Sequence, residues 1–351
     1  MHTMPRMARI GLLTGGGDCP GLNPVIRAVV RKGIDTYGHE IFGFRKGWKG
    51  VLDNDAIQLT RENTSGILHK GGTMLGTSRT NVYKTEDGEA RVLASLKERE
   101  IDVLIPVGGD DTLGVARKLY AAGFPTVGVP KTIDNDLNAT DFTFGFQTAV
   151  QIATEAIDRL HSTAESHDRV IVCEVMGRDA GWLACWSGLA GGADVILVPE
   201  RPFDVEEVCA HIRNRHENSA RTFSIVVVAE GATRSDGAAA ATAADTLDSF
   251  GHARLGGIAF ELEKEIEERT GYESRATVLG HIQRGGSPVA FDRVLGTRFG
   301  VAAIDAASNG DFGMMTALHG TSIELVPLED ALKEPKLLDP ELFKTAQVFF
   351  G

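Results

Sequence analysis

The sequence contains no apolar stretch that approaches the roughly 20 residues needed to cross a membrane as a helix. Residues 1–9 also lack the long apolar segment of a secretion signal. Both absences argue against a membrane-embedded or exported protein. We therefore expect a cytoplasmic protein that has no membrane partner.

Cysteine and positive charge are both scarce. The chain has 36 Lys and Arg against 48 Asp and Glu, a net charge of −12. Such an acidic chain disfavours nucleic acid as a partner, so any anionic substrate must be met by local cations. The cysteines show no C-x-x-C spacing, and we expect them to be reduced, buried thiols. They are Cys19, Cys173, Cys185 and Cys209.

The chain is longer than one hydrophobic core usually supports. Its 351 residues, 42% of them hydrophobic, predict two domains. Apolar strand-like runs alternate with helix-like segments, which predicts a layered α/β fold. An alanine-rich segment at residues 238–244 is expected to be a surface loop or a short helix. The expected strands are 10–14, 103–107, 126–129, 170–175, 195–198, 222–229 and 276–279, and the expected helices include one from Pro24 to Tyr37, 147–161 and 255–270.

The glycine-rich turn after the first strand matches no common nucleotide motif. The chain has no Gly-Lys-Ser/Thr, and Pro20 stands where the dinucleotide fingerprint needs a third glycine. The GGGD turn at residues 15–18 therefore predicts either a simple tight turn or backbone that approaches a phosphate closely. A second glycine-rich segment, residues 71–79, ends in Arg79, which either binds a phosphate or is simply solvated.

Two acidic clusters lie at the ends of expected buried strands. The sequences GGDDT and PKTIDND each follow an apolar run, and they contribute Asp110, Asp111, Asp134 and Asp136. These side chains would meet at the carboxyl edge of a parallel sheet, where ligands bind. Mg²⁺ binding and proton abstraction both require carboxylates in such a place. Any single aspartate could instead cap a helix, an alternative that weakens when all four are considered.

Other polar groups end later strands, whereas two arginines begin strands. MGR at residues 176–178, Glu230 and HIQRGG at residues 281–286 supply acceptors and cations suited to a phosphorylated polyol. Arg169 and Arg275 would lie at the opposite sheet edge. They could serve this site only from a neighbouring subunit, and the alternative is a surface salt bridge.

Four segments closely resemble the phosphofructokinase family, and they occur in the family's order. The similarity extends from about residue 10 to about residue 305. It implies an α/β fold of two Rossmann-like three-layer domains with mainly parallel sheets and the active site in the cleft between them. It also implies a homodimer or homotetramer whose subunits share substrate arginines. The four segments are GGDCPGLN, TIDND, EVMGR and LGHIQRGGSP.

The resemblance implies a division of labour between the domains and among their residues. Residues 1–145 plus about 284–327 would bind the phosphoryl donor and Mg²⁺, and residues 146–283 plus about 328–351 would bind the sugar phosphate. Asp134 would be the general base for the C1 hydroxyl of fructose 6-phosphate, and Asp110 would hold Mg²⁺. The donor would contact Gly17 and Arg79. Lys131 and Arg178 would assist catalysis, and the sugar would contact Thr132, Ile133, Asp134, Met176, Gly177, Arg178, Glu230, His281, Ile282, Gln283 and Arg284, with Arg169 and Arg275 supplied by a neighbouring subunit.

Two positions indicate pyrophosphate as the phosphoryl donor. ATP-dependent relatives typically carry glycine where this chain has Asp111, and often where it has Lys131. The Asp111 carboxylate would repel a nucleotide α-phosphate by about 4 kcal/mol at a separation of about 4 Å and an effective dielectric of about 20. Lys131 would stabilise charge that develops on the leaving oxygens of pyrophosphate. The products would be fructose 1,6-bisphosphate and phosphate, in a reversible step of glycolysis.

Three alternatives are an ATP-dependent 6-phosphofructokinase, a catalytically silent regulatory or sugar-phosphate-binding subunit, and a nucleotide or lipid kinase with a similar Gly-Gly-Asp turn. Retention of Asp110, Asp134 and Asp136 argues against a silent subunit, and residues 281–288 argue against the other kinases. The sequence does not separate dimer from tetramer. The same phosphate clamp would also accept sedoheptulose 7-phosphate.

Overall fold

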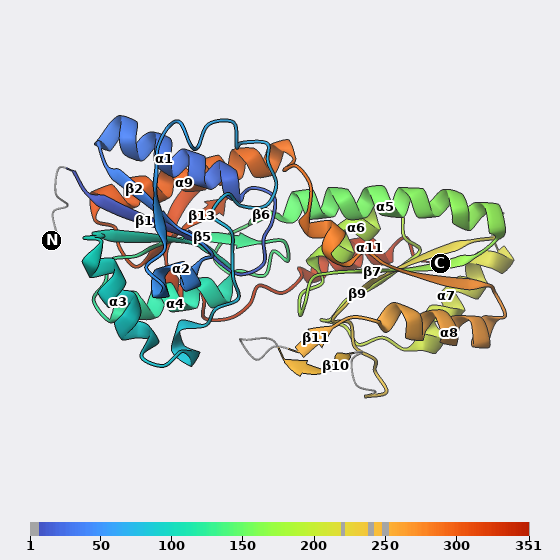
Figure 1. Ribbon diagram of the computed structural model, residues 1–351. Helices are drawn as coiled ribbons and strands as arrows, with labels where there is room; N and C mark the ends of the chain where they lie inside the picture. The colour runs from blue at the N-terminus through green and yellow to red at the C-terminus, as the bar shows by residue number, and fades with distance from the viewer. Residues whose placement is uncertain (1–6, 219–221, 238–241, 248–252, 351) are drawn as a thin grey trace. The chain divides into compact units, whose positions relative to one another are not determined.

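The computed structural model describes residues 7–218, 222–237, 242–247 and 253–350 (Figure 1). The chain divides into two compact units, each assembled from segments distant in sequence. The assignment of donor and sugar phosphate to separate units stays a prediction. The first unit is Met1–Ile133, Leu137–Gln147 and Arg284–Pro335, and the second is Asp134–Asp136, Thr148–Gln283 and Lys336–Gly351.

The first unit is built on an eight-stranded sheet with the order β14-β13-β5-β4-β1-β2-β3, to which β6 adds by pairing with β5. Pairing is parallel except for β2 with β3 and β13 with β14, which are antiparallel. The sheet is therefore mainly parallel, as predicted. Its strands are β1 (Arg9–Thr14), β2 (Glu40–Phe44), β3 (Ala56–Leu59), β4 (Val103–Gly108), β5 (Val127–Thr132), β6 (Phe144–Gly145), β13 (Met314–His319) and β14 (Ser322–Pro327).

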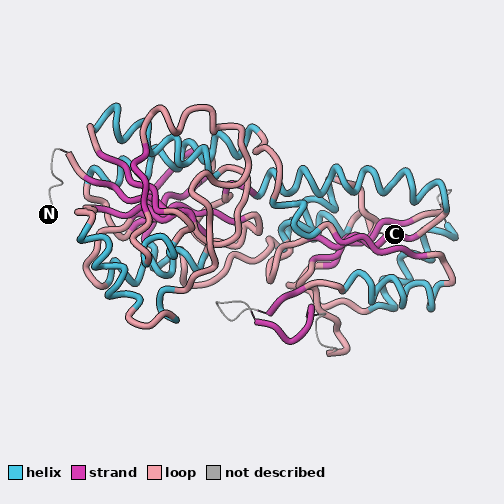
Figure 2. The backbone as a smooth tube through the Cα atoms, viewed as in Figure 1, coloured by secondary structure: helices cyan, strands magenta, loops and turns pink. Residues whose placement is uncertain are grey.

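Helices cover both faces of this sheet (Figures 1 and 2). α1 packs beside α9 on one face, while α3 and α4 enclose an apolar core on the other. This arrangement gives the three layers that alternating strands and helices predict. The helices are α1 (Leu22–Tyr37), α2 (Trp48–Leu52), the 3₁₀ turn η1 (Val82–Lys84), α3 (Gly88–Glu98), α4 (Asp110–Ala121), α9 (Ala290–Asn309) and α10 (Leu328–Ala331).

The second unit is built on a wholly parallel four-stranded sheet with the order β12-β7-β9-β8. Helices α7 and α8 pack on one face around an apolar core, and α5 and α6 cover the other (Figure 1). Its elements are α5 (Phe146–His167), β7 (Val170–Val175), α6 (Trp182–Ala190), β8 (Val195–Leu197), α7 (Val205–Asn218), β9 (Ser224–Ala229), the antiparallel pair β10 (Thr242–Leu247) and β11 (Ala253–Leu255), α8 (Ile258–Thr270), β12 (Ser274–Val278), η2 (Gly280–Arg284) and α11 (Pro340–Gln347).

Most predicted boundaries differ from the structure by one or more residues, and two of these differences concern motifs of the candidate site. The strand expected at 126–129 continues to Thr132, because Lys131 and Thr132 pair with β6. The first helix begins at Leu22 rather than Pro24. A proline is tolerated there because the first backbone N–H groups of a helix have no partner within the helix. Part of the sequence PKTIDND therefore belongs to the strand itself.

The remaining expectations about buried and apolar segments have mixed outcomes. All four cysteines are buried and free of disulfide bonds, as predicted. In the alanine-rich segment, residues 238–241 lie outside the described residues, and the prediction of a loop or helix is wrong from Thr242 onward, where β10 begins. Across the described residues, the structure has no helix both long and apolar enough to cross a membrane.

Candidate functional site

The glycine turn after β1 lies against the first turn of α4. Gly15 N donates to the carbonyl of Val107, which joins the end of β1 to the neighbouring strand β4. A Cβ atom placed on Gly15 would lie 2.5 Å from the hydroxyl oxygen of Thr112, and one on Gly108 would also overlap this side chain. Glycine is therefore required for α4 to approach both strand ends. Sequence reasoning did not identify Thr112, which is the last residue of GGDDT.

Two cations converge on the backbone of this turn. Lys131 is a buried residue near the end of β5, and its ammonium donates to the carbonyl of Gly17. The Arg284 guanidinium donates to the carbonyl of Asp18 at 3.4 Å, and a Cβ atom on Gly17 would lie 2.6 Å from its Nη1 atom. Buried and half-buried cations beside a glycine turn suit an anionic phosphate. Arg284, expected among the sugar-binding residues, thus lies at this glycine turn in the first unit.

The second glycine-rich loop is bound to the same turn. Thr77 Oγ1 donates to Gly16 O at 2.5 Å, and Gly16 N donates to Ser78 O at 3.3 Å. Asn23, which sequence reasoning did not assign to the site, holds the start of the loop through its side-chain amide. These bonds bring the exposed Arg79 into the neighbourhood of Gly16 and Gly17. The two glycine-rich segments therefore form one backbone surface.

Asp110 and Asp111 are the first two residues of α4, and Gly109 occupies the N-cap position without a side-chain cap. The capping alternative is therefore wrong for both residues. Their carboxylates are stabilised by the positive end of the helix dipole. A helix N-terminus without acidic residues would attract a phosphate. Two carboxylates in the first turn of α4 instead attract a cation and repel a phosphate that approaches the helix directly.

The end of β5 and the segment that follows it are buried. Thr132 is 8% exposed and Asp134 is 4% exposed. Ile133 is fully buried, and its Cγ2 atom would lie 3.4 Å from a Cβ atom on Gly145. Ile133 can therefore reach a ligand only through its backbone. The neighbouring Cys19 thiol stays neutral, because burial raises its pKa to about 12.

In the second unit, candidate sugar-binding residues gather at the carboxyl ends of three adjacent strands. Arg178 N, after β7, donates to Glu230 Oε1, after β9, at 3.2 Å. Met176 N donates to Gln283 Oε1, after β12, at 3.4 Å, and Gln283 is fully buried. The backbone reverses sharply at Gly177 and Arg178, which have φ angles of 137° and 51°. The structure thus brings these predicted residues together.

The remaining members of the η2 segment are more exposed. His281 and Ile282 both reach solvent, and Ile282 is 68% exposed. Gln283 instead points inward, where its amide also donates to Gly280 O at 3.1 Å. Gln283 therefore holds the η2 segment in place, while the side chains of His281 and Ile282 are exposed to solvent.

Arg169 and Arg275 lie at the amino ends of β7 and β12, the opposite edge of the same sheet, as predicted. Both form ion pairs with Glu273 of the same chain, at 2.8 Å and 2.5 Å. These arginines lower the pKa of the Glu273 carboxyl below its usual value. The surface salt bridge that the sequence suggested as an alternative is therefore present, while a role in a neighbouring subunit's site stays a prediction. Glu273 has no sequence signal beyond its proximity to Arg275.

Comparison with known proteins identifies the family. The model of the phosphofructokinase family matches residues 9–307. A protein of Amycolatopsis methanolica named pyrophosphate–fructose 6-phosphate 1-phosphotransferase is 59% identical over 343 residues, which cover 98% of this chain and all of the relative. A protein of Mycobacterium leprae named ATP-dependent 6-phosphofructokinase is 52% identical over 344 residues, with the same coverage.

A solved structure of phosphofructokinase from Saccharomyces cerevisiae resembles most of this fold. The TM-score is 0.80 at 31% sequence identity, over 93% of this chain. The match covers 45% of the yeast chain, so this chain spans less than half the length of that relative. Sequence family, full-length relatives and fold agree: the chain belongs to the phosphofructokinase family.

Proposed function

We propose that this protein transfers a phosphoryl group from pyrophosphate to the C1 hydroxyl of fructose 6-phosphate, giving fructose 1,6-bisphosphate and phosphate. The observation that carries the proposal is the placement of Lys131 and Asp111 around the glycine turn of the first unit. Lys131 binds the carbonyl of Gly17, and Asp111 is the second residue of α4, next to Thr112, which lies against Gly15 and Gly108. The name of the A. methanolica relative supports the same donor.

The two side chains favour pyrophosphate in different ways: Lys131 stabilises it, and Asp111 disfavours the competing donor ATP. The Lys131 ammonium, held on backbone that a phosphate would approach, neutralises charge on the pyrophosphate oxygens as the bridging bond breaks. The Asp111 carboxylate lies where a longer donor would place a further phosphate, and repulsion there disfavours ATP. Arg79 and Arg284, which belong to the same turn and loop, add positive charge for a short, highly charged donor.

Asp134 takes the proton from the C1 hydroxyl of the sugar. Its carboxyl is 4% exposed, and it follows β5 only three residues after Lys131, so the chain itself brings base and donor-binding cation into one segment. Phosphoryl transfer needs positioning and charge neutralisation more than covalent chemistry. A buried segment that carries both groups supports that requirement.

Asp110 is the residue that would hold Mg²⁺. Across the described residues, no three His, Cys, Asp or Glu side chains gather into a metal-binding group. This fits Mg²⁺, which binds proteins through one or two carboxylates and takes its other ligands from water and substrate phosphates. The bound ion would supply neutralisation of charge on the transferred phosphoryl group.

The carboxyl ends of β7, β9 and β12 are the proposed sugar-phosphate site. Thr132, Ile133 through its backbone, and the second-unit residues Met176, Gly177, Arg178, Glu230, His281, Ile282 and Gln283 would contact the sugar. Arg169 and Arg275 would clamp the 6-phosphate of a neighbouring subunit in a homodimer or homotetramer, and Glu273 would hold both arginines ready. An arginine pair is suited to bidentate phosphate binding.

The alternative donor is ATP, because a relative named for ATP is 52% identical. Initial rates with pyrophosphate or ATP, measured on wild-type protein, Asp111→Gly and Asp111→Asn, decide between them. We expect wild-type turnover with pyrophosphate alone. Asp111→Gly should gain measurable ATP turnover because it removes both charge and bulk, and Asp111→Asn, which removes the charge alone, reports how much of the barrier is electrostatic. Equal use of ATP by wild-type protein would contradict the proposal.

A further inference from the structure

The hairpin of β13 and β14 holds the loop that follows Asp134. Leu318 N donates to Thr140 Oγ1 at 2.9 Å, and Asp141 N donates to Leu318 O at 2.8 Å. Gly320 N, in the hairpin turn, donates to Asp141 Oδ2 at 2.6 Å. These bonds fasten Thr140 and Asp141 to a hairpin that lies about 180 residues further along the chain.

The ring of His319, at the end of β13, makes two further hydrogen bonds, and both depend on its protonation. Its Nδ1 atom lies 2.9 Å from Glu324 Oε2, and its Nε2 atom lies 3.0 Å from the backbone carbonyl oxygen of Ala139. A carboxylate and a carbonyl oxygen are both acceptors, so each ring nitrogen must carry a hydrogen to make its bond. The geometry is therefore satisfied only by the doubly protonated, positively charged imidazole.

The loop that His319 holds has an uncommon backbone conformation. Asn135 and Ala139 have φ angles of 54° and 59°, in the left-handed region that alanine rarely adopts. Asn138 Oδ1 accepts a hydrogen bond from Ala139 N at 2.8 Å. The backbone carbonyl of Ala139 is bonded by His319. Such a conformation persists only where surrounding contacts enforce it.

We propose that His319 is a positioning residue for the reaction: in its charged form it holds residues 135–141, and through them sets the placement of Asp134. The inference rests on the proposed function, since it assigns a purpose to the loop behind the proposed base. When the ring loses one proton, the remaining proton stays on Nδ1, because the Glu324 carboxylate is the stronger acceptor. The bare Nε2 then faces the Ala139 carbonyl, and two lone pairs repel.

The charged groups around the ring agree with this geometry. Hydrogen bonding to Glu324 and to the Ala139 carbonyl, together with the charge of Asp141, raises the pKa of His319 above its usual value, and partial burial opposes the rise. Arg298, on α9, contacts the same hairpin turn, where it donates to Thr321 O at 2.6 Å. Because the folded pKa is raised, the stabilisation is complete below the unfolded pKa of about 6.5 and is lost as pH rises through the folded pKa.

The charge state is tested by nuclear magnetic resonance titration of wild-type protein with labelled histidine side chains, with His319→Ala to assign the signal. We expect His319 to titrate above about 6.5. Glu324→Gln should move that titration to lower pH, since the amide keeps an acceptor but removes the charge. A His319 pKa at or below the ordinary value would overturn the proposal, whether or not the proposed reaction is correct.

The positioning role is tested by kcat for fructose 6-phosphate phosphorylation by pyrophosphate as a function of pH. Wild-type kcat should fall at least about tenfold as His319 loses its proton, with little change in KM. His319→Ala should show the low value at every pH, and Glu324→Gln should move the fall to lower pH. His211→Ala, on α7 in the second unit, is the matched control and should keep the wild-type profile. An unchanged profile in His319→Ala would refute the role, whereas absence of turnover in wild-type protein would refute the proposed function and leave the titration result standing.

Discussion

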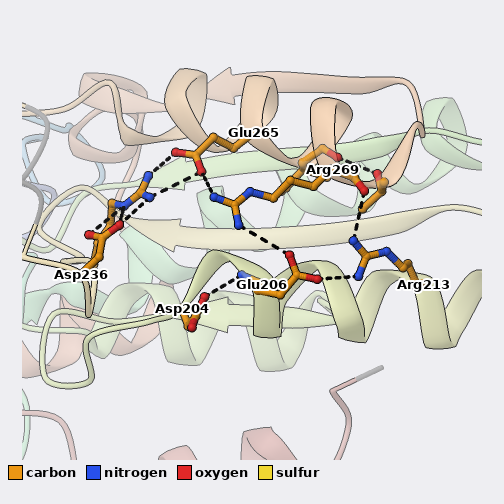
Figure 3. A network of polar contacts seen from close by, with 9 residues as sticks. Asp204, Glu206, Arg213, Asp236, Glu265 and Arg269 are labelled. Atoms are coloured by element: carbon orange, nitrogen blue, oxygen red, sulfur yellow. Dashed lines mark hydrogen bonds and ion pairs between the residues drawn. The ribbon is translucent and has the colours of Figure 1, made fainter.

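Charge is concentrated in two regions of the molecule, but it is arranged differently in each. At the glycine turn of the first unit, Lys131 and Arg284 bind backbone carbonyls of Gly17 and Asp18. On helices α7 and α8 of the second unit and on the segment that follows β9, arginines and carboxylates instead alternate in a continuous network (Figure 3). The network consists of Asp236, Arg234, Glu265, Arg269, Glu206 and Arg213.

Under the proposed function, the difference separates charges that bind a ligand from charges that stabilise the fold. In the network each arginine lowers the pKa of a carboxyl that it contacts, as for Glu206 beside Arg213 and Glu265 beside Arg234. Mutual neutralisation leaves little field for a third partner. A bond to an uncharged carbonyl does not cancel the charge of a cation, so the bonds to Gly17 and Asp18 leave an attraction for phosphate at the glycine turn. Changes at strand ends should therefore affect turnover, and changes in the network should affect only stability.

The largest effect is expected at Asp134. Asp134→Asn keeps size and shape but removes the proton acceptor, so kcat should fall by about 10²–10⁴-fold while the thermal unfolding midpoint changes little. Asp87→Asn is the matched control, because Asp87 is an exposed residue before α3 whose side chain makes no cap bond. Turnover of Asp134→Asn close to that of the control would show that another group removes the proton.

A large effect on stability is expected at Glu174, a carboxylate that belongs neither to the glycine turn nor to the charged network. It is 1% exposed on β7, and its oxygens accept from Gly257 N and Ala259 N at 3.0–3.1 Å, at the start of α8. Glu174→Gln would turn an amide N–H₂ toward these donors and should lower the free energy of unfolding by about 2–3 kcal/mol in urea titrations.

Glu268→Gln, on the exposed side of α8, is the control for Glu174→Gln and should change the free energy of unfolding by less than about 0.5 kcal/mol. Equal stability of the two variants would mean that Glu174 does not hold the helix start. Since Met176 and Gly177 follow Glu174 closely, the KM for fructose 6-phosphate should also rise in Glu174→Gln.

Sequence patterns predicted what is local and missed what depends on packing. Strands β4 and β7 appear in the sequence as apolar runs that are followed by polar motifs, so the parallel sheets and the polar residues at their strand ends were predicted. The roles of those residues in a site stay predictions. The contact of Arg284 with Gly17 depends on how distant segments fold together, and so does the ion pair of Glu273 with Arg169. Neither could be read from the sequence. Within the network, Glu265 and Arg269 are four residues apart and could be paired from sequence, but Arg234 and Glu265 are 31 residues apart and could not.

The smallest effect is expected from the pair Arg234 and Glu265, whose side chains are 17% and 25% exposed. A double-mutant cycle with Arg234→Ala and Glu265→Gln should give a coupling free energy of about 1 kcal/mol that shrinks as salt is added, because partial exposure screens the pair. The pair lowers the pKa of Glu265, so its contribution is present above the unfolded pKa and is lost as pH falls through the folded pKa. Turnover with pyrophosphate should match wild-type protein in all three variants. A loss of kcat without a loss of stability would show that the network acts on the reaction, and the distinction between ligand-directed and fold-directed charges would then fail.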